Sequence, residues 1–175
     1  MVMSGRRWAI LGSATFAIVG AAGCGSATPS GGSTTITSGS GSTSNSSAAA
    51  TAAAAGAAYV TAFNTMNDAV NADIPAQNKA GTDPTGATTA INDEASARQT
   101  FDTAVQAITF PASDQADAQA VLSADASLES VLGTLAANTN DIGNYNSIFD
   151  TVTPAQSAFT AADNALSNEL GLTSG

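Results

Sequence analysis

The sequence predicts an all-α protein, an antiparallel up-down-up-down four-helix bundle that follows a signal peptide and a disordered tether. Apolar side chains recur at steps of three and four residues from Tyr59 to Leu170, which is the spacing of one helical face. Short polar and Pro-containing breaks divide that pattern into four parts, and short connections favour antiparallel neighbours. We therefore assign residues 1–23 to a signal peptide, 24–47 to a tether and 48–175 to the helical domain.

The N-terminus has the parts of an export signal. Arg6 and Arg7 precede an apolar segment, Trp8–Gly20, which is shorter than the about 20 residues that a membrane-spanning helix needs. The sequence AAGC that follows resembles the lipobox of bacterial lipoproteins, although the first residue of that motif is usually Leu rather than Ala. The resemblance implies cleavage between Gly23 and Cys24 and a lipid on Cys24.

Two other interpretations of this region stay open. Ordinary signal cleavage near Ala22 would leave Cys24 as a free thiol, which is prone to oxidation outside the cytoplasm. The Arg6-Arg7 pair also resembles a twin-arginine export signal, although the residues after the pair match that pattern only loosely.

The tether is recognised by its composition. Residues 25–47 carry no charge and consist almost entirely of Gly, Ser and Thr. Such a segment buries too little apolar surface to offset the entropy of ordering, so we expect it to be disordered. A chain of this length and composition has an r.m.s. reach of about 25–30 Å, which would keep the folded domain near the membrane and clear of the headgroups.

The first helix is expected to begin in the Ala-rich residues 48–58 and to end at Ile74, because Pro75 follows. Its apolar face consists of Tyr59, Phe63, Met66 and Val70, which we interpret as core. The second helix should begin at Asp83-Pro84, with Asp83 as the N-cap and Pro84 at the first helical position. It should continue to the break at Phe110-Pro111.

The third helix should be capped by Ser113 or Asp114 and should end near Asn138. The break before it is so short that the second and third helices must be antiparallel neighbours. Its apolar positions are Val121, Leu122, Leu128, Val131, Leu132 and Leu135.

The fourth helix should be capped by Asn140 or Asp141. Pro154 interrupts it and should kink or split it. The pair Gly171-Leu172 predicts a Schellman-type end, with Leu172 packing back on the last turn.

Composition excludes several classes of function. The chain has a net charge of −10, no His and one Cys, so it lacks imidazole nucleophile systems, an internal disulfide and a thiolate zinc site. Because the domain is acidic, we expect no nucleic-acid partner. The neighbours Asp93 and Glu94 are interpreted as a solvated face, and Asp114 with Asp117 as a helix start.

We therefore predict no catalytic residue, no metal ligand and no cofactor. A faint calcium-loop pattern in residues 138–143 lacks the alternating acids and the later Glu that such a loop needs, and we interpret it as a turn.

Arg98 is the one base expected within the helices. It lies on the apolar seam, where an unpaired charge would be costly to bury. If the hairpin turns between Pro111 and Ala112, positions at equal distance from the turn meet, and Arg98 lies beside Asp125. We predict a partly buried ion pair between these two side chains, and a role for Arg98 in gripping an anionic ligand is the alternative.

The order of lipobox, tether and helical domain resembles a group of actinobacterial secreted lipoproteins of unassigned function. The resemblance rests on Ala97-Arg98…Phe101-Asp102…Phe110-Pro111 and on Ala165-Leu166…Leu170-Gly171-Leu172. It implies a lipid-anchored location on the outer face of the cytoplasmic membrane and the helical fold, and it supplies no catalytic residue.

The leading hypothesis for function is a non-enzymatic protein, held to the membrane by lipidated Cys24, that binds an envelope partner or acts as a scaffold. The first alternative is a carrier that holds a small ligand between helices where Pro154 opens the fourth. The second is a hydrolase that uses carboxylates alone, which would need two inward-facing acids at a cleft.

Overall fold

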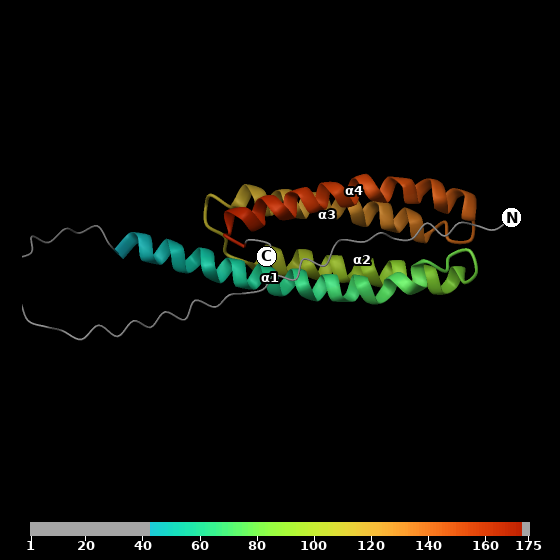
Figure 1. Cartoon of the computed structure of the whole chain (residues 1–175), viewed down its shortest axis with the longest axis horizontal. Helices are drawn as coiled ribbons and strands as arrows, with labels where there is room; N and C mark the ends of the chain where they lie inside the picture. The colour runs from blue at the N-terminus through green and yellow to red at the C-terminus, as the bar shows by residue number, and fades with distance from the viewer. Residues whose placement is uncertain (1–42, 173–175) are drawn as a thin grey trace, which may run out of the picture.

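The structure is a computed structural model that describes residues 43–172, with side-chain surroundings described from residue 49. This part of the chain forms four helices and no strand, which confirms the all-α prediction. They are α1 (Thr43–Gln77), α2 (Pro84–Ala107), α3 (Gln115–Ala136) and α4 (Ile142–Glu169). Figure 1 shows successive helices side by side, joined by short loops at alternating ends of the bundle.

The helices pack in chain order, α1 on α2, α2 on α3 and α3 on α4. Side chains close the ring between α1 and α4, where the Phe63 and Phe159 rings stack with centroids 6.4 Å apart. Phe101 of α2 meets both rings edge-on, at 6.3 Å from Phe63 and 6.0 Å from Phe159. Offset and edge-to-face rings are the favoured arrangements of buried aromatics. This aromatic group therefore ties three helices together.

Two apolar clusters fill the interior. The first surrounds the aromatic group and includes Met66, Val70 and Leu166. The second lies toward the loops that join α1 to α2 and α3 to α4, and it includes Ile91, Leu132 and Tyr145. The assignment of Tyr59, Phe63, Met66 and Val70 to the core is confirmed, since all four are buried.

The predicted helix starts are largely confirmed. Asp83 is the N-cap of α2 and its Oδ1 accepts a hydrogen bond from Gly86 N at 3.0 Å. Asp141 caps α4 through bonds from the backbone N–H groups of Gly143 and Asn144. Asp114 is the N-cap residue of α3, but its side chain makes no capping bond and accepts from Ser113 Oγ instead.

The predicted end of α4 is also confirmed. Gly171 has φ +70°, Leu172 N donates to Ser167 O at 2.8 Å, and Gly171 N donates to Asn168 O at 3.1 Å. This pair of bonds is the Schellman motif. Leu172 packs against the first apolar cluster, and its Cδ2 lies beside Gly56 of α1.

Three predicted boundaries of the helices are wrong. α1 begins at Thr43, inside the segment 24–47 assigned to the tether, since a helix extends easily from the Ala-rich residues that follow. α1 also continues past Pro75 to Gln77, because a proline near the end of a helix removes few backbone bonds and Asn78 N still donates to Ile74 O. α4 is continuous through Pro154, so the predicted split is wrong, while the alternative of a kink at Pro154 stays a prediction.

The signal peptide, Cys24 and most of the predicted tether lie outside the described residues. Among the described helices, none combines the length and the apolar character that crossing a membrane requires.

Candidate functional site

Arg98 is the centre of a buried charge network between α2 and α3. Its side chain is fully buried, and its Nη1 lies 2.5 Å from Asp125 Oδ1. This is the ion pair that the hairpin register predicts, and it is completely rather than partly buried. Arg98 Nε also donates to Glu94 Oε1 at 3.0 Å, one helical turn away. The guanidinium carbon lies 5.4 Å from the centre of the Phe159 ring, so the cation also contacts an aromatic face.

Glu94 corrects one interpretation of the sequence. It was expected on a solvated face with Asp93, but it is 1% exposed, whereas Asp93 is exposed. Its Oε2 accepts from Gln77 Nε2 at 2.8 Å, which fixes the last turn of α1 against α2. The neighbours differ because side chains one residue apart on a helix point about 100° apart. Asp114 is also buried, and together with Asp117 it lies at the start of α3, as the sequence predicts.

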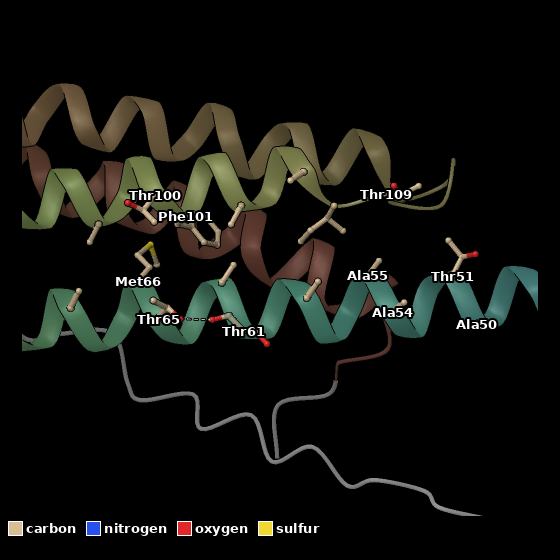
Figure 2. Close-up of a pocket in the computed structure, with 17 residues that line it drawn as sticks. Ala50, Thr51, Ala54, Ala55, Thr61, Thr65, Met66, Thr100, Phe101 and Thr109 are labelled. Carbon is tan, nitrogen blue, oxygen red and sulfur yellow. Dashed lines mark hydrogen bonds between the residues drawn. The ribbon is translucent and has the colours of Figure 1, made fainter.

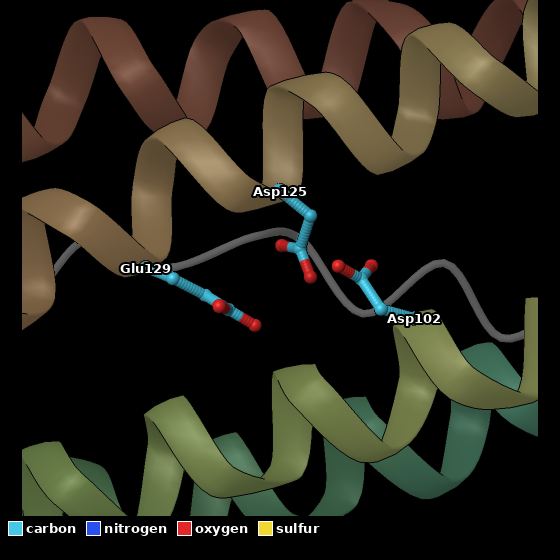
Figure 3. Close-up of side chains that lie close together, drawn as sticks. All are labelled: Asp102, Asp125 and Glu129. Carbon is cyan, nitrogen blue, oxygen red and sulfur yellow. The ribbon is translucent and has the colours of Figure 1, made fainter.

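A second group of carboxylates adjoins the network. Asp102 lies one turn after Arg98 on α2, and Glu129 lies one turn after Asp125 on α3. One carboxylate oxygen from each of Asp102, Asp125 and Glu129 lies within 4.8 Å of the other two. Figure 3 shows the Asp125 and Asp102 carboxylates facing each other across the seam, with Glu129 reaching into the same space. This group is not apparent from the sequence, from which no metal ligand was predicted.

The pKa values of these carboxyl groups are raised. Burial, and then the charges of Asp125 and Glu129, raise the pKa of Asp102 to about 7. Burial also raises the pKa of Asp125, although its bonds to Arg98 act in the opposite direction. Burial and the charge of Asp125 raise the pKa of Glu129. Ionised carboxylates this close together repel one another, so the group favours a proton or a cation.

A groove of about 1200 Å³ lies between α1 and α2. Figure 2 shows side chains of both helices lining it, with Met66 and Phe101 between the two helices. Apart from Met66, Phe101 and Ile108, the lining consists of Ala and Thr, and it includes no charged residue. It follows α1 from Ala50 to Ala69, which corresponds to about 29 Å of helix. Small side chains create the groove because they leave the space between two neighbouring helices unfilled.

The structure does not bring all the predicted site residues together. Arg98 and Asp125 meet in the buried network, and Pro154 is exposed on α4. The groove lies between α1 and α2 and not beside Pro154, so it does not coincide with the predicted carrier site, which stays a prediction. Gly23 and Cys24 lie outside the described residues.

Two signals in the sequence point to the carboxylate group and to the groove. For the carboxylate group, the equal-distance relation that pairs Arg98 with Asp125 also places Glu94 opposite Glu129, so it brings further acids to the seam between α2 and α3. The groove follows an Ala and Thr stripe on α1, but Ala and Thr stripes occur on many helices.

Comparison with known proteins adds no relative: no protein-family model, no curated protein and no solved structure matches the chain.

Proposed function

We propose that this protein is a non-enzymatic, lipid-anchored helical bundle on the outer face of the cytoplasmic membrane, and that it carries the acyl chain of an uncharged lipid in the groove between α1 and α2. The observation that supports this most strongly is the uncharged lining. The chain has 14 acidic residues, yet none of them lines a groove of about 1200 Å³. Ligand pockets for apolar molecules are of this kind and of similar or smaller volume, about 300–1,000 Å³.

The shape of the groove favours an elongated occupant. It extends for about 29 Å along α1 and remains open along its side, as a groove for a flexible chain should be. The chain as a whole carries a net charge of −10, so an anionic lipid would be repelled by the protein. A second copy of this chain would carry the same charge and is disfavoured for the same reason. These two arguments select a neutral lipid.

The proposed anchor supports the same role. Figure 1 shows the first turns of α1 extending beyond the other helices. The groove begins at Ala50, near the start of α1. Cys24 precedes α1 in the sequence by a segment rich in Gly, Ser and Thr. A lipid on Cys24 would hold the open end of the groove within reach of the bilayer surface, where neutral lipids are available.

The binding site is tested with one pair of neighbouring alanines on α1. Ala58 lines the groove and Ala57 does not, and both are exposed. We expect Ala58→Asp to weaken binding of a fluorescently labelled diacylglycerol at least tenfold, because the carboxylate would lose water on contact with the acyl chain. Ala57→Asp should bind as the unsubstituted protein does. Equal affinity in the two variants, or no binding by the unsubstituted protein, would contradict the proposal.

The scaffold role makes a different prediction for the same position. If the groove holds a partner protein, a photocrosslinker at residue 58 should capture one envelope protein in intact cells while diacylglycerol does not bind. The hydrolase alternative is not favoured by the groove, because its lining offers no carboxylate for acid–base work.

The anchor is tested by Cys24→Ser. Without the thiol there is no site for the lipid, and we expect the acidic domain to be shed into the medium or to keep its signal peptide. Fractionation followed by mass measurement of the N-terminus distinguishes these outcomes. Protein that remains membrane-bound after removal of its signal peptide would contradict lipid anchoring.

A further inference from the structure

We propose that Asp102, Asp125 and Glu129 bind one divalent cation at the seam between α2 and α3, and that Ca²⁺ is the ion that fits best. The three side chains come from two helices and offer one oxygen each, all within 4.8 Å of one another. Figure 3 shows them gathered around a common space in the seam. This site is separate from the groove, which lies on the other side of α2 against α1.

Unpartnered buried oxygen atoms are the second observation that supports the site. Asp125 is 0% exposed, and while its Oδ1 binds Arg98, its Oδ2 has no hydrogen-bond partner. Asp102 Oδ1 and Glu129 Oε1 are also buried without a partner. Buried polar atoms are almost always satisfied in native proteins. Asp102 and Asp125 can satisfy each other only while one of them holds a proton for a shared hydrogen bond, so once both are ionised the buried acceptors need a cation. A cation satisfies all three at once.

The ligand set selects the kind of ion. Carboxylate oxygens without nitrogen or sulfur are the ligands of hard cations such as Ca²⁺ and Mg²⁺. Ca²⁺–oxygen distances are about 2.3–2.6 Å, so oxygens on opposite sides of Ca²⁺ lie about 4.6–5.2 Å apart, whereas around Mg²⁺ they lie about 4.0–4.2 Å apart. Oxygens within 4.8 Å of one another fit around Ca²⁺, and its flexible coordination suits an irregular set of protein ligands better than the strict octahedron of Mg²⁺ does. Asp102 and Glu129 are partly exposed, so water can reach the site and complete the coordination.

The local charge also favours a divalent cation. Within residues 43–172, Arg98 is the one cation that forms ion pairs with this network, and it is shared between Glu94 and Asp125. Among the residues that the structure describes, neither Asp102 nor Glu129 forms an ion pair with a cation of its own. A divalent ion would compensate both of these charges. The raised pKa values of the three carboxyl groups are consistent with this, because ionisation is costly until a cation arrives.

The experiment is a calorimetric titration of the purified metal-free protein with CaCl₂, and separately with MgCl₂, at pH 7.5. We expect one Ca²⁺ per chain with a Kd of about 10⁻⁵ to 10⁻³ M, and weaker binding of Mg²⁺. Asp102→Asn and Glu129→Gln should each weaken Ca²⁺ binding at least tenfold. Asp93→Asn is the matched control, since Asp93 is an exposed acid on the same helix as Asp102, and it should leave the Kd unchanged.

Circular dichroism of each variant shows whether it is folded, and the partly exposed Glu129 provides a second test if an Asp102 variant unfolds. Absence of Ca²⁺ binding to the folded protein would overturn the proposal, and so would equal weakening by Asp93→Asn. A proton shared by Asp102 and Asp125 is the competing explanation. It would give a protein whose melting temperature Ca²⁺ leaves unchanged at pH 7.5, and this result would also overturn the site.

Discussion

Arg98 and Asp125 face each other across the α2–α3 hairpin, with Nη1 2.5 Å from Oδ1 and both residues fully buried. Glu94 binds the other side of the same guanidinium through Nε. One buried cation therefore serves two buried carboxylates on two helices. Since buried ions are costly to leave unpaired, this arrangement fixes the register of α2 against α3.

Removing the cation should be the most damaging single change in this network. Arg98→Met leaves Glu94 and Asp125 buried without a positive charge, and we expect the free energy of unfolding to fall by about 3–5 kcal/mol. Asp125→Leu should cost less, because Arg98 keeps its bond to Glu94 and because repulsion of Asp102 is relieved. Urea unfolding measures both values.

The matched control for this prediction is the triple variant Glu94→Gln, Arg98→Met, Asp125→Leu. It removes all three charges together, so it should be more stable than Arg98→Met alone. Costs below about 1 kcal/mol for both single variants, the value typical of exposed pairs, would show that the pairing contributes little.

Features that depend only on neighbouring residues in the chain could be predicted from the sequence. Asp83, Asp141 and Gly171 are recognised by the chemistry of helix ends, and the Arg98–Asp125 pair follows from the short hairpin. The predicted end of α1 before Pro75 is wrong because contacts with other helices stabilise the last turn of α1. Gln77 binds Glu94 through its side chain, and its carbonyl oxygen accepts from Tyr145 at 3.4 Å. Such tertiary contacts override local preference and are not visible in a single helix.

The groove and the carboxylate group depend on how whole helices are placed. Ala and Thr on α1 predict a close helix neighbour as readily as an open groove, and the distance between α1 and α2 decides between them. Asp102 and Glu129 look like ordinary surface acids until the rotation of each helix about its axis is known. The burial of Glu94, in contrast with Asp93, is a further consequence of that rotation.

The bond between Tyr59 and Asp163 should make a measurable contribution to stability. The Tyr59 hydroxyl donates to Asp163 Oδ1 at 2.6 Å and joins α1 to α4. We expect Tyr59→Phe to lower the free energy of unfolding by about 1.5–3 kcal/mol, because a buried carboxylate loses its donor. Burial raises the pKa of Asp163 while this bond lowers it, so the variant should also show a higher Asp163 pKa by NMR titration.

Asp163→Asn tests the origin of that effect. The amide oxygen still accepts from Tyr59, and the cost of burying a charge is removed, so its unfolding free energy should change by less than about 1 kcal/mol. A loss as large as that of Tyr59→Phe would indicate that the charge itself, rather than the hydrogen bond, stabilises the contact.

Stability of the metal-free protein should decrease as the pH rises from about 4 to about 7. Burial, followed by the charges of Asp125 and Glu129, raises the pKa of Asp102 to about 7, against about 3.9 in an unfolded chain. The native state thus holds a proton that the unfolded state has released, so this stabilisation is complete below pH 4 and is lost as the pH passes 7. Arg98 acts in the opposite direction but is the weakest of the causes.

Thermal melts between pH 4 and pH 8 measure this dependence. Asp102→Asn should flatten it, because the amide does not titrate, whereas Asp93→Asn should leave it unchanged. A melting temperature that rises steadily from pH 5 to pH 8 in the metal-free protein would contradict the prediction. Other carboxyl groups whose pKa is raised act in the same direction, namely Asp73, Asp125, Glu129 and Asp163.

Two glycines should respond to alanine in opposite ways. Gly171 has φ +70° and ends α4 in the Schellman motif, so Gly171→Ala places a side chain in the left-handed region and should cost about 1–2 kcal/mol. Gly133 lies inside α3, and an added Cβ there meets nothing within 4 Å, so Gly133→Ala should stabilise by about 0.5–1 kcal/mol. Urea unfolding of the two variants under identical conditions gives both values. A neutral Gly171→Ala would contradict the first prediction. It would show that Leu172 keeps its place beside Gly56 through its own packing and does not need the left-handed turn.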